Sequence, residues 1–422
     1  MIEYDTIIAG GGPSGMTAAL QCARKGQRVL LIDRGDRIGK KILVTGNGKC
    51  NLTNVKQNLE CYRGEDPKKI SKILSAFGQQ NAMELFHQLG ICTREKNGYI
   101  YPYNEQAAAV RDAFECAIVS NENISIWTES SVTGVQKEKQ NFLIFVKNHT
   151  QAKEKKLLCK SFIIATGGLA GIKLGCDGTG YAIAKAMGHH IVPPYPALTA
   201  LKSAAPFLKK INGVRNQAAI TLFVDGKEVC KERGELQWTA YGISGVAVFQ
   251  ISRYAVVALE EKKQVCLSLD FMPNYTEKQT EEILISCCKT CSYKTYEQLL
   301  CGILPAKLVP IVLREASIQM EKRVHTPSTT QIQNLVKAIK TFCLRISGYV
   351  GYEKAQVTRG GVDMKEVSSE LESVLCEGLF FAGEVLDVDG TCGGYNLQWA
   401  FSSGSVAGQA AWKRNQKINS AL

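Results

Sequence analysis

The beginning of the chain alternates between short apolar runs and polar turns in a pattern that predicts a strand, a helix and a second strand. Residues 6–9, TIIA, form an apolar, partly β-branched run of the kind buried in a parallel sheet. Residues 16–25 are rich in alanine and amphipathic, which predicts a helix that ends at Gly26. A second apolar run, VLLI, follows at residues 29–32. This order predicts a βαβ unit and hence an α/β fold.

The turn before the helix carries the spacing G-x-G-x-x-G through Gly10, Gly12 and Gly15. In a βαβ unit the first glycine allows a tight turn, the second lets the backbone approach a pyrophosphate, and the third lets the helix pack on the strand. Asp33 ends the second strand, where a carboxylate can accept hydrogen bonds from the ribose of an adenosine. The pattern predicts an ADP-binding unit, with a glycine turn in another α/β fold as the alternative. Its candidate cofactor-binding residues are Gly10, Gly12, Pro13, Ser14, Gly15 and Asp33.

A glycine-rich, basic segment follows at residues 34–54. Glycines leave the backbone free to approach a ligand closely, and the interspersed lysines and arginines suit a pyrophosphate. We therefore expect this segment to run along the pyrophosphate and over a flavin ring. A mobile surface loop is the alternative. The candidate cofactor-binding residues here are Arg34, Lys40, Lys41, Thr45, Gly46, Asn47, Gly48, Cys50 and Asn51.

The sequence between residues 131 and 168 predicts a small antiparallel meander followed by a return to the parallel sheet. Residues 131–136, 142–146 and 156–158 have strand-like patterns, and residues 161–168, SFIIATGG, read as a buried strand that ends in small residues. Small residues let the chain turn beside a dinucleotide. Asp177 can instead cap the helix expected at residues 181–187. The candidate cofactor-binding residues in this part are Val132, Ala165, Thr166, Gly167 and Asp177.

The character of the sequence changes at the proline-rich residues 193–196, after which strand-like and helical pieces alternate. We expect residues 193–345 to form an inserted substrate or lid domain. Residues 1–192 and 346–422 then form one discontinuous FAD-binding domain.

The last third returns to apolar strands and glycine turns. Residues 379–384, LFFAGE, predict a strand ending in Gly-Glu, and a Gly-Gly-Tyr-Asn turn then opens a helix rich in alanine, serine and glycine. The amides at such a helix start can stabilise negative charge on a reduced flavin. A closely packed core helix is the alternative explanation of the small residues. The candidate cofactor-binding residues are Gly383, Glu384, Asp389, Gly394, Tyr395, Asn396 and Leu397.

Composition narrows the class of protein. The chain has 422 residues, a formal charge of +12 and a hydrophobic fraction of 45%, which suit a globular protein of two or three domains with anionic ligands. No apolar run is long enough to span a bilayer, and no signal-peptide pattern precedes the first strand, so we expect a cytoplasmic protein. The 16 cysteines are scattered, and the single C-x-x-C, at Cys288 and Cys291, has no second pair at zinc spacing. We expect no metal site.

Several motifs together resemble the BaiN-like flavoproteins, also described as aminoacetone-oxidase-like FAD-binding enzymes. They are GGGPSGMTAAL at residues 10–20, GKKILVTGNGKCNLTN at 39–54, ATGG at 165–168, VTRGGV at 357–362 and FAGEVLDVDGTCGGYNLQWAFSSG at 381–404. The resemblance covers nearly the whole chain. It implies a two-dinucleotide-binding, Rossmann-type FAD domain, a non-covalent FAD site, and an inserted domain made of a small β-barrel and helices.

The function expected on these grounds is an FAD-dependent oxidoreductase whose flavin N5 exchanges hydride between NADH or NADPH and an organic substrate, such as the C=C bond of an enone or steroid-like compound. A second complete G-x-G-x-x-G unit is missing from the sequence, so a nicotinamide would bind transiently. The alternatives are an FAD-dependent amine oxidase that uses oxygen and an RNA-associated or non-catalytic flavin-binding protein. We expect a small-molecule substrate and neither a nucleic-acid nor a membrane partner. No catalytic residue is assigned; Tyr395, Tyr349, Arg359 and Tyr241 are pocket candidates.

Overall fold

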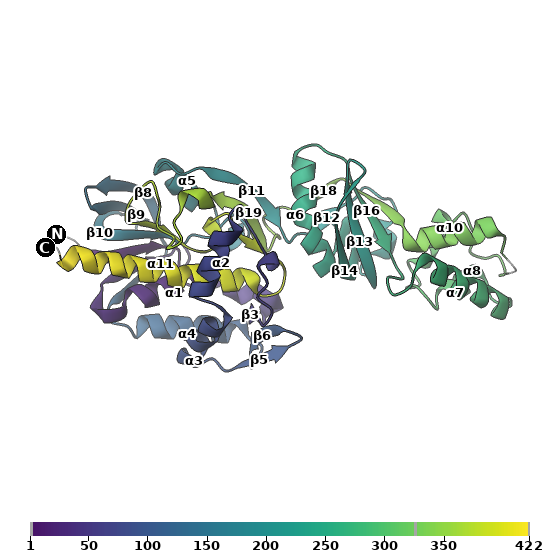
Figure 1. Cartoon of the computed structure of the whole chain (residues 1–422), viewed down its shortest axis with the longest axis horizontal. Coiled ribbons are helices and arrows are strands. Elements are labelled where there is room, and N and C mark those ends of the chain that lie inside the picture. The colour runs from purple at the N-terminus through teal and green to yellow at the C-terminus, as the bar shows by residue number, and fades with distance from the viewer. Residues whose placement is uncertain (1–2, 325–326, 421–422) are drawn as a thin grey trace. The chain divides into compact units, whose positions relative to one another are not determined.

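The computed structural model describes residues 3–324 and 327–420. It divides the chain into two compact units, of which unit 1 comprises Met1–Pro194 and Val357–Leu422, and unit 2 comprises Tyr195–Gln356 (Figure 1). The chain returns to unit 1 after residue 356 rather than after residue 345, because the strands at 342–346 and 348–349 pair within the sheet of unit 2.

A seven-stranded sheet forms the centre of unit 1, in the order β7-β2-β1-β10-β9-β8, with β20 also paired to β10. The strands β7, β2, β1, β10 and β20 run parallel, whereas β9 and β8 add an antiparallel meander. The sequence predicted a meander strand at residues 156–158 and a separate return strand at residues 161–168. In the structure they form one continuous strand, β10, whose first half pairs with β9 and whose second half pairs with β20. The bounds are β1 Tyr4–Ala9, β2 Val29–Ile32, β7 Ile124–Trp127, β8 Ser130–Glu138, β9 Asn141–Asn148, β10 Glu154–Ile164 and β20 Leu379–Phe381.

The helices of unit 1 cover this sheet, and α1 and α11 pack directly against each other (Figure 1). A Cβ atom at Gly404 would lie 2.3 Å from the carbonyl oxygen of Ser14, and one at Gly408 would lie 2.7 Å from that of Ala18. Close packing therefore explains part of the small-residue composition of α11. The helix bounds are α1 Pro13–Cys22, α2 Pro67–Ala76, α3 Gln79–Gln88, α4 Ala107–Val119, α5 Thr179–Ala186 and α11 Tyr395–Ser420.

A buried polar network joins the far end of α11 to the sheet. The Lys160 ammonium lies 2.5 Å from a carboxylate oxygen of Asp5, and both residues are only 7% exposed. Asn415 donates to the Thr6 hydroxyl and to the Asp5 carbonyl. The C-terminal helix is thus held at both of its ends, since its first turn contacts the loops described below.

Short strands complete unit 1. Two of them, β4 and β21, pair antiparallel and connect the first and last thirds of the chain. The strands β3, β6 and β5 form a small sheet, which follows the glycine-rich, basic segment of residues 34–54, here called the basic loop. β11 pairs with β19 where the chain leaves and re-enters the unit. The bounds are β3 Thr53–Asn54, β4 Tyr62–Arg63, β5 Thr93–Lys96, β6 Tyr99–Pro102, β11 Ile191–Ala197, β19 Val357–Val362 and β21 Asp389–Gly390.

Unit 2 is built on a second seven-stranded sheet, in the order β17-β16-β13-β14-β15-β12-β18. Its two end strands, β17 and β18, are separated in the chain by Ser347 alone. The sheet must therefore curve until its ends meet, as in a small barrel. The bounds are β12 Leu201–Lys202, β13 Arg215–Val224, β14 Lys227–Thr239, β15 Gly242–Ser244, β16 Val265–Asp270, β17 Phe342–Ile346 and β18 Gly348–Tyr349.

The aromatic side chains of Phe207, Trp238, Phe271 and Phe342 contact one another inside this sheet. α6 packs on β14 and β13. A separate group of helices, which we call the helical subdomain (residues 277–340), lies between β16 and β17 in the chain (Figure 1). The helix bounds in unit 2 are α6 Val246–Glu260, α7 Glu277–Thr290, α8 Tyr296–Leu300, α9 Val309–Glu315 and α10 Thr329–Lys340.

Candidate functional site

The glycine turn after β1 shows two kinds of glycine. Gly10 has φ +106°, and a Cβ atom there would lie 2.3 Å from the carbonyl oxygen of Ala165. A Cβ atom at Gly15 would lie 1.8 Å from the carbonyl oxygen of Gly10. Both positions are therefore restricted to glycine by the protein itself, because the backbone of β10 and the turn approach too closely for any side chain.

Gly12 differs from both. Within the described residues nothing lies within 4 Å of a Cβ atom built there, and its φ of −76° and ψ of −177° are open to any residue. The other glycines with open space of this kind, at residues 26, 90, 213 and 226, all have positive φ. Neither packing nor backbone conformation explains a glycine at residue 12, whereas a bound group that approaches the backbone does.

Asp33 ends β2 directly beside this turn. One carboxylate oxygen accepts a hydrogen bond from the amide of Gly11 at 2.7 Å, and the other accepts from the amide of Gly35 at 2.7 Å. Burial raises the pKa of Asp33, although both of these hydrogen bonds act in the opposite direction. Gly11 was missing from the sequence-based candidates, yet a Cβ atom there would lie 2.6 Å from Ile38 and 3.0 Å from the Asp33 carboxylate. The carboxylate is held in a fixed position against the turn.

Within the basic loop, Lys40–Gly48 consists of two short 3-10 turns separated by a kink, where Thr45 is extended and Gly46 and Asn47 are left-handed; Gly48 also has positive φ. Cys50 is also left-handed, with φ 57°, and it is buried. Burial raises the pKa of the Cys50 thiol to about 11, so this cysteine stays protonated near neutral pH and is no reactive thiolate.

Several side chains fasten this loop. The Lys49 ammonium lies 2.7 Å from Glu105, and the Thr45 hydroxyl donates to the carbonyl of Ile42 at 2.6 Å. Lys40 lies 2.7 Å from the exposed Asp36. The loop is thus held by polar contacts at its beginning, middle and end.

Lys41 connects this loop to the last third of the chain. Its ammonium lies 2.5 Å from one oxygen of Glu384, and the other oxygen accepts from the amide of Thr358 at 2.6 Å. Burial opposes the charged form of Lys41, but the carboxylate of Glu384 more than offsets this and leaves the pKa of Lys41 raised. Glu384 therefore joins three segments that are far apart in the sequence.

A second set of contacts joins the end of the loop to the start of α11. With its amide oriented to satisfy both neighbours, Asn51 accepts from the amide of Gly394 at 3.2 Å and donates to the carbonyl of Thr53 at 3.0 Å. Asn54, which the sequence prediction omitted, donates to the carbonyl of Gly393 at 3.1 Å. A Cβ atom at Gly394 would lie 2.7 Å from the Thr53 carbonyl oxygen. The two predicted segments therefore meet along their backbones.

The first turn of α11 presents the amides of Tyr395, Asn396 and Leu397, which have no carbonyl one turn earlier in the helix. The side chain of Asn396 exchanges hydrogen bonds with the backbone of Gly390 at 2.7 and 2.9 Å. It therefore supports the turn, and only its amide is available to a ligand. Burial raises the pKa of the Tyr395 hydroxyl, and its contact with Cys61 acts in the same direction.

Other predicted residues lie on several further elements of unit 1. Asp177 forms an ion pair with Arg34 and accepts from the amide of Thr179, next to the start of α5. The strand end at Ala165, Thr166 and Gly167 follows β10, with Gly167 at φ +74°. Val132 lies buried in β8. The buried Asp389 lies in β21, where its backbone is opposite that of Arg63 in β4.

The four pocket candidates divide between the units. Arg359 and Tyr395 belong to unit 1, whereas Tyr241 and Tyr349 belong to unit 2. The hydroxyl of Tyr349 donates to Glu260 at 2.5 Å, and burial followed by this hydrogen bond raises its pKa. Tyr241 is 39% exposed. No group of His, Cys, Asp and Glu suited to a metal ion occurs among residues 3–324 and 327–420.

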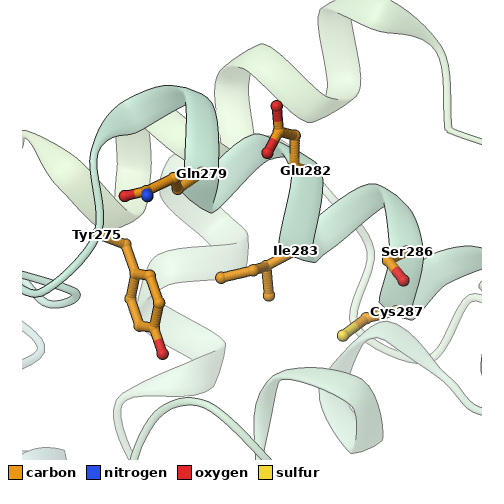
Figure 2. Close-up of a pocket in the computed structure, with 6 residues that line it drawn as sticks. All are labelled: Tyr275, Gln279, Glu282, Ile283, Ser286 and Cys287. Carbon is orange, nitrogen blue, oxygen red and sulfur yellow. The ribbon is translucent and has the colours of Figure 1, made fainter.

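A surface groove of about 400 Å³ lies on unit 2 (Figure 2). It is lined by Tyr275, Gln279, Glu282, Ile283, Ser286 and Cys287, and all of these except Tyr275 lie on α7. None of them is among the predicted cofactor-binding residues. Across the described part of the chain, no helix is both long and apolar enough to cross a membrane.

Known proteins resemble the chain over nearly its whole length. The HI0933-like protein Rossmann domain matches residues 4–410. A 3-dehydro-bile acid delta(4,6)-reductase of Clostridium scindens is 39% identical over 96% of this chain and 98% of its own. A ribosomal RNA dihydrouridine synthase of Haemophilus influenzae is 33% identical over 96% and 97%.

Among solved structures, an Escherichia coli quinol fumarate reductase aligns with a TM-score of 0.52 and 14% identity over 98% of this chain and 71% of its own. At this identity the likeness concerns the fold alone. The expected Rossmann-type fold, the resemblance to a flavoprotein family and the assignment to the oxidoreductases are confirmed. With its family model matching residues 4–410, the chain belongs to the HI0933-like Rossmann family.

Proposed function

We propose that this protein is an FAD-dependent reductase that saturates a C=C bond conjugated to a carbonyl group, with NADH or NADPH as a transient electron donor. The observation that carries the proposal is the shared chemistry of its relatives. A bile acid delta(4,6)-reductase and a dihydrouridine synthase act on unrelated molecules. Both names nevertheless describe the addition of two hydrogens to a C=C bond, and in both molecules that bond is conjugated to a carbonyl.

The residues of unit 1 fit FAD. The open space at Gly12 suits a pyrophosphate, and the fixed carboxylate of Asp33 suits an adenosine ribose. The segments around Lys41 and Gly394 are joined to each other and suit the flavin end of the same molecule. When bound, FAD would supply hydride exchange at its N5 position.

The side chains and amides of this region would perform three tasks. The amides of the first turns of α1 and α11 provide partial positive charge, with which they would hold the pyrophosphate and the ring system of FAD respectively. The half-buried ammonium of Lys41 is held in place by the carboxylate of Glu384, which offsets its positive charge. The buried, protonated Cys50 contributes packing rather than a thiolate.

The first candidate substrate class is a small enone or steroid-like compound. The reductase relative is 39% identical to this chain, compared with 33% for the dihydrouridine synthase of Haemophilus influenzae. A small-molecule substrate agrees with the expectation drawn from the sequence. The proposed donor is NADH or NADPH, which would bind transiently because the sequence has one complete G-x-G-x-x-G unit.

Ribosomal RNA is the second candidate substrate. The sequence led us to expect no nucleic-acid partner, but relatives that are 33% and 30% identical over at least 96% of this chain are named ribosomal RNA dihydrouridine synthases. The formal charge of +12 favours a polyanion as well. Nucleic acid therefore stays a candidate beside the small enone.

Anaerobic mixing of the FAD-loaded protein with NADH and NADPH tests the proposal. Loss of the flavin absorbance, followed by its return when an enone steroid is added and by a product heavier by two hydrogens, is the expected result. Return of absorbance with unmodified ribosomal RNA, and not with the enone, would favour the second candidate. Absorbance that is unchanged by both nicotinamides, together with peroxide release from an amine in air, would contradict the proposal in favour of an amine oxidase.

A further inference from the structure

Two cysteines lie on the neighbouring strands that lead into and out of the helical subdomain of unit 2. Cys266 is in β16, which leads toward α7, and Cys343 is in β17, which follows α10. The two strands pair antiparallel, with Cys266 opposite Arg345 and Cys343 opposite Ser268. Figure 1 shows α7, α8 and α10 grouped together beyond one end of the sheet of unit 2.

The two thiols point to the same side of the sheet and meet there. Along β17, Phe342, Leu344 and Ile346 are buried, whereas Cys343 and Arg345 between them are exposed. Cys266 is half-buried in the matching position of β16. The two sulfur atoms lie 2.7 Å apart. A disulfide bond requires about 2.05 Å between its sulfurs. Because the two cysteines are diagonal rather than directly opposite in the register, closing the bond requires a side-chain rotation and a local shift of the two strands.

We propose that Cys266 and Cys343 form a reversible disulfide by reaction with small disulfides of the glutathione class. This is a modification site in unit 2 that does not depend on the proposed flavin chemistry. The exposed Cys343 thiolate attacks one sulfur of the small disulfide, forms a mixed disulfide and releases one small thiolate. The Cys266 thiolate then attacks the Cys343 sulfur and releases the second. The cysteine pair is oxidised by two electrons, the small disulfide is reduced to two thiols, and the two cysteine protons pass to those thiols or to water.

The surroundings agree with this order of events. Burial, followed by the contact with Cys343, raises the pKa of Cys266 to about 12, whereas the nearby Arg345 acts in the opposite direction. Cys266 is therefore protonated at rest, and exposed Cys343 is the better first nucleophile. Once Cys343 carries the small thiol, Arg345 remains opposite Cys266 to favour its thiolate.

The bond would link the two strands between which the helical subdomain is inserted in the chain. Cys266 and Cys343 are 77 residues apart in the sequence, and the chain between them contains α7, α8, α9 and α10. The ammonium of Lys340 lies 2.7 Å from Asp270 and 2.9 Å from the carbonyl of Met272, and this contact holds the end of β16 that leads into the subdomain. A covalent link between β16 and β17 closes the loop that contains the subdomain and reduces the conformational freedom of that segment in the unfolded state.

Peptide mapping of the full-length protein after incubation with oxidised glutathione tests the proposal. The expected result is one linked pair of peptides containing Cys266 and Cys343, formed with the loss of two hydrogens and separated again by reduced glutathione. Protease cleavage inside residues 277–340 should then leave one band on a non-reducing gel and two fragments after reduction. The native chain suffices for both readouts, so they do not depend on the folding of a variant.

Variants provide the matched comparison. Cys266→Ser should retain one glutathione on Cys343 and give no linked peptides, whereas Cys301→Ser, at another exposed cysteine of the helical subdomain, should behave like the native chain. Independent glutathione adducts on both cysteines, linkage of either one to a different cysteine, or two unmodified thiols would each overturn the proposal. Flavin absorbance recorded in parallel reports on unit 1, so failure of one proposal is distinguishable from failure of the other.

Discussion

Substitution of Gly12 by alanine separates the effect of a bound cofactor from the effect of protein packing. The Cβ atom of the new residue would have no neighbour within 4 Å in the described chain. The backbone angles at this position, φ −76° and ψ −177°, are ordinary for alanine. The substitution therefore adds a methyl group to a space that only the proposed pyrophosphate fills.

The expected change in the stability of the flavin-free protein is small. Loss of a glycine N-cap costs about 0.5–1 kcal/mol, and the lower entropy of the unfolded chain gains about 0.4–1 kcal/mol. These contributions nearly cancel. In the FAD complex, by contrast, the methyl group must displace the pyrophosphate from the backbone, and we expect a loss of at least about 1.4 kcal/mol, which is tenfold in Kd.

Two measurements check this prediction. FAD titration of the flavin-free protein, followed by fluorescence, gives the change in Kd, and urea unfolding of the flavin-free protein gives the change in the free energy of unfolding. Gly15→Ala is the matched control, because its Cβ atom would lie 1.8 Å from the Gly10 carbonyl oxygen and should destabilise the fold itself by about 1–3 kcal/mol. An unchanged Kd for Gly12→Ala in a stably folded protein would refute the reasoning.

Three further predictions concern polar contacts. Glu384→Gln removes the charge that holds the half-buried Lys41 in place, so FAD affinity measured by titration should fall about tenfold. Equal affinity would argue against a link between this pair and the cofactor. Lys160→Met leaves Asp5 buried without its cation and should lower the free energy of unfolding in urea by about 3 kcal/mol, whereas a loss below about 1 kcal/mol would indicate a solvated pair. The pKa of Glu105 is lowered from 4.5 to about 2, and the hydrogen bond from Lys49 is the largest cause. The contact between Lys49 and Glu105 therefore stabilises the basic loop fully above pH 4.5, and this stabilisation is lost as the pH falls toward 2. Hydrogen exchange of residues 40–50 across that range should show the loss, and Glu105→Gln should abolish the pH dependence.

Local pattern was sufficient to predict the first βαβ unit. The apolar runs of β1 and β2 are buried on both faces, and the turn between them needs glycine at Gly10 and Gly15 for reasons of close backbone approach. These are effects of neighbours in the sequence, or of one adjacent strand. The oxidoreductase class followed from several such motifs occurring in the expected order.

Contacts between distant segments could not be predicted in the same way. The ion pair of Lys41 and Glu384 joins residues 343 positions apart, and no periodicity connects them. Cys266 and Cys343 likewise appear in the sequence as two scattered cysteines, and only the register of β16 and β17 brings their sulfurs together. The composition of α11 had two explanations, and the structure assigns Gly404 and Gly408 to packing while leaving the first turn of the helix to the proposed cofactor.

The central claim is that segments from the two ends of the chain bind one FAD molecule together. Hydrogen exchange of the full-length protein with and without saturating FAD tests it most directly. We predict stronger protection of the amides at residues 10–15 and at residues 383–397 in the same titration, with equal midpoints. Protection of one segment alone, or of neither when FAD is bound, would contradict the account.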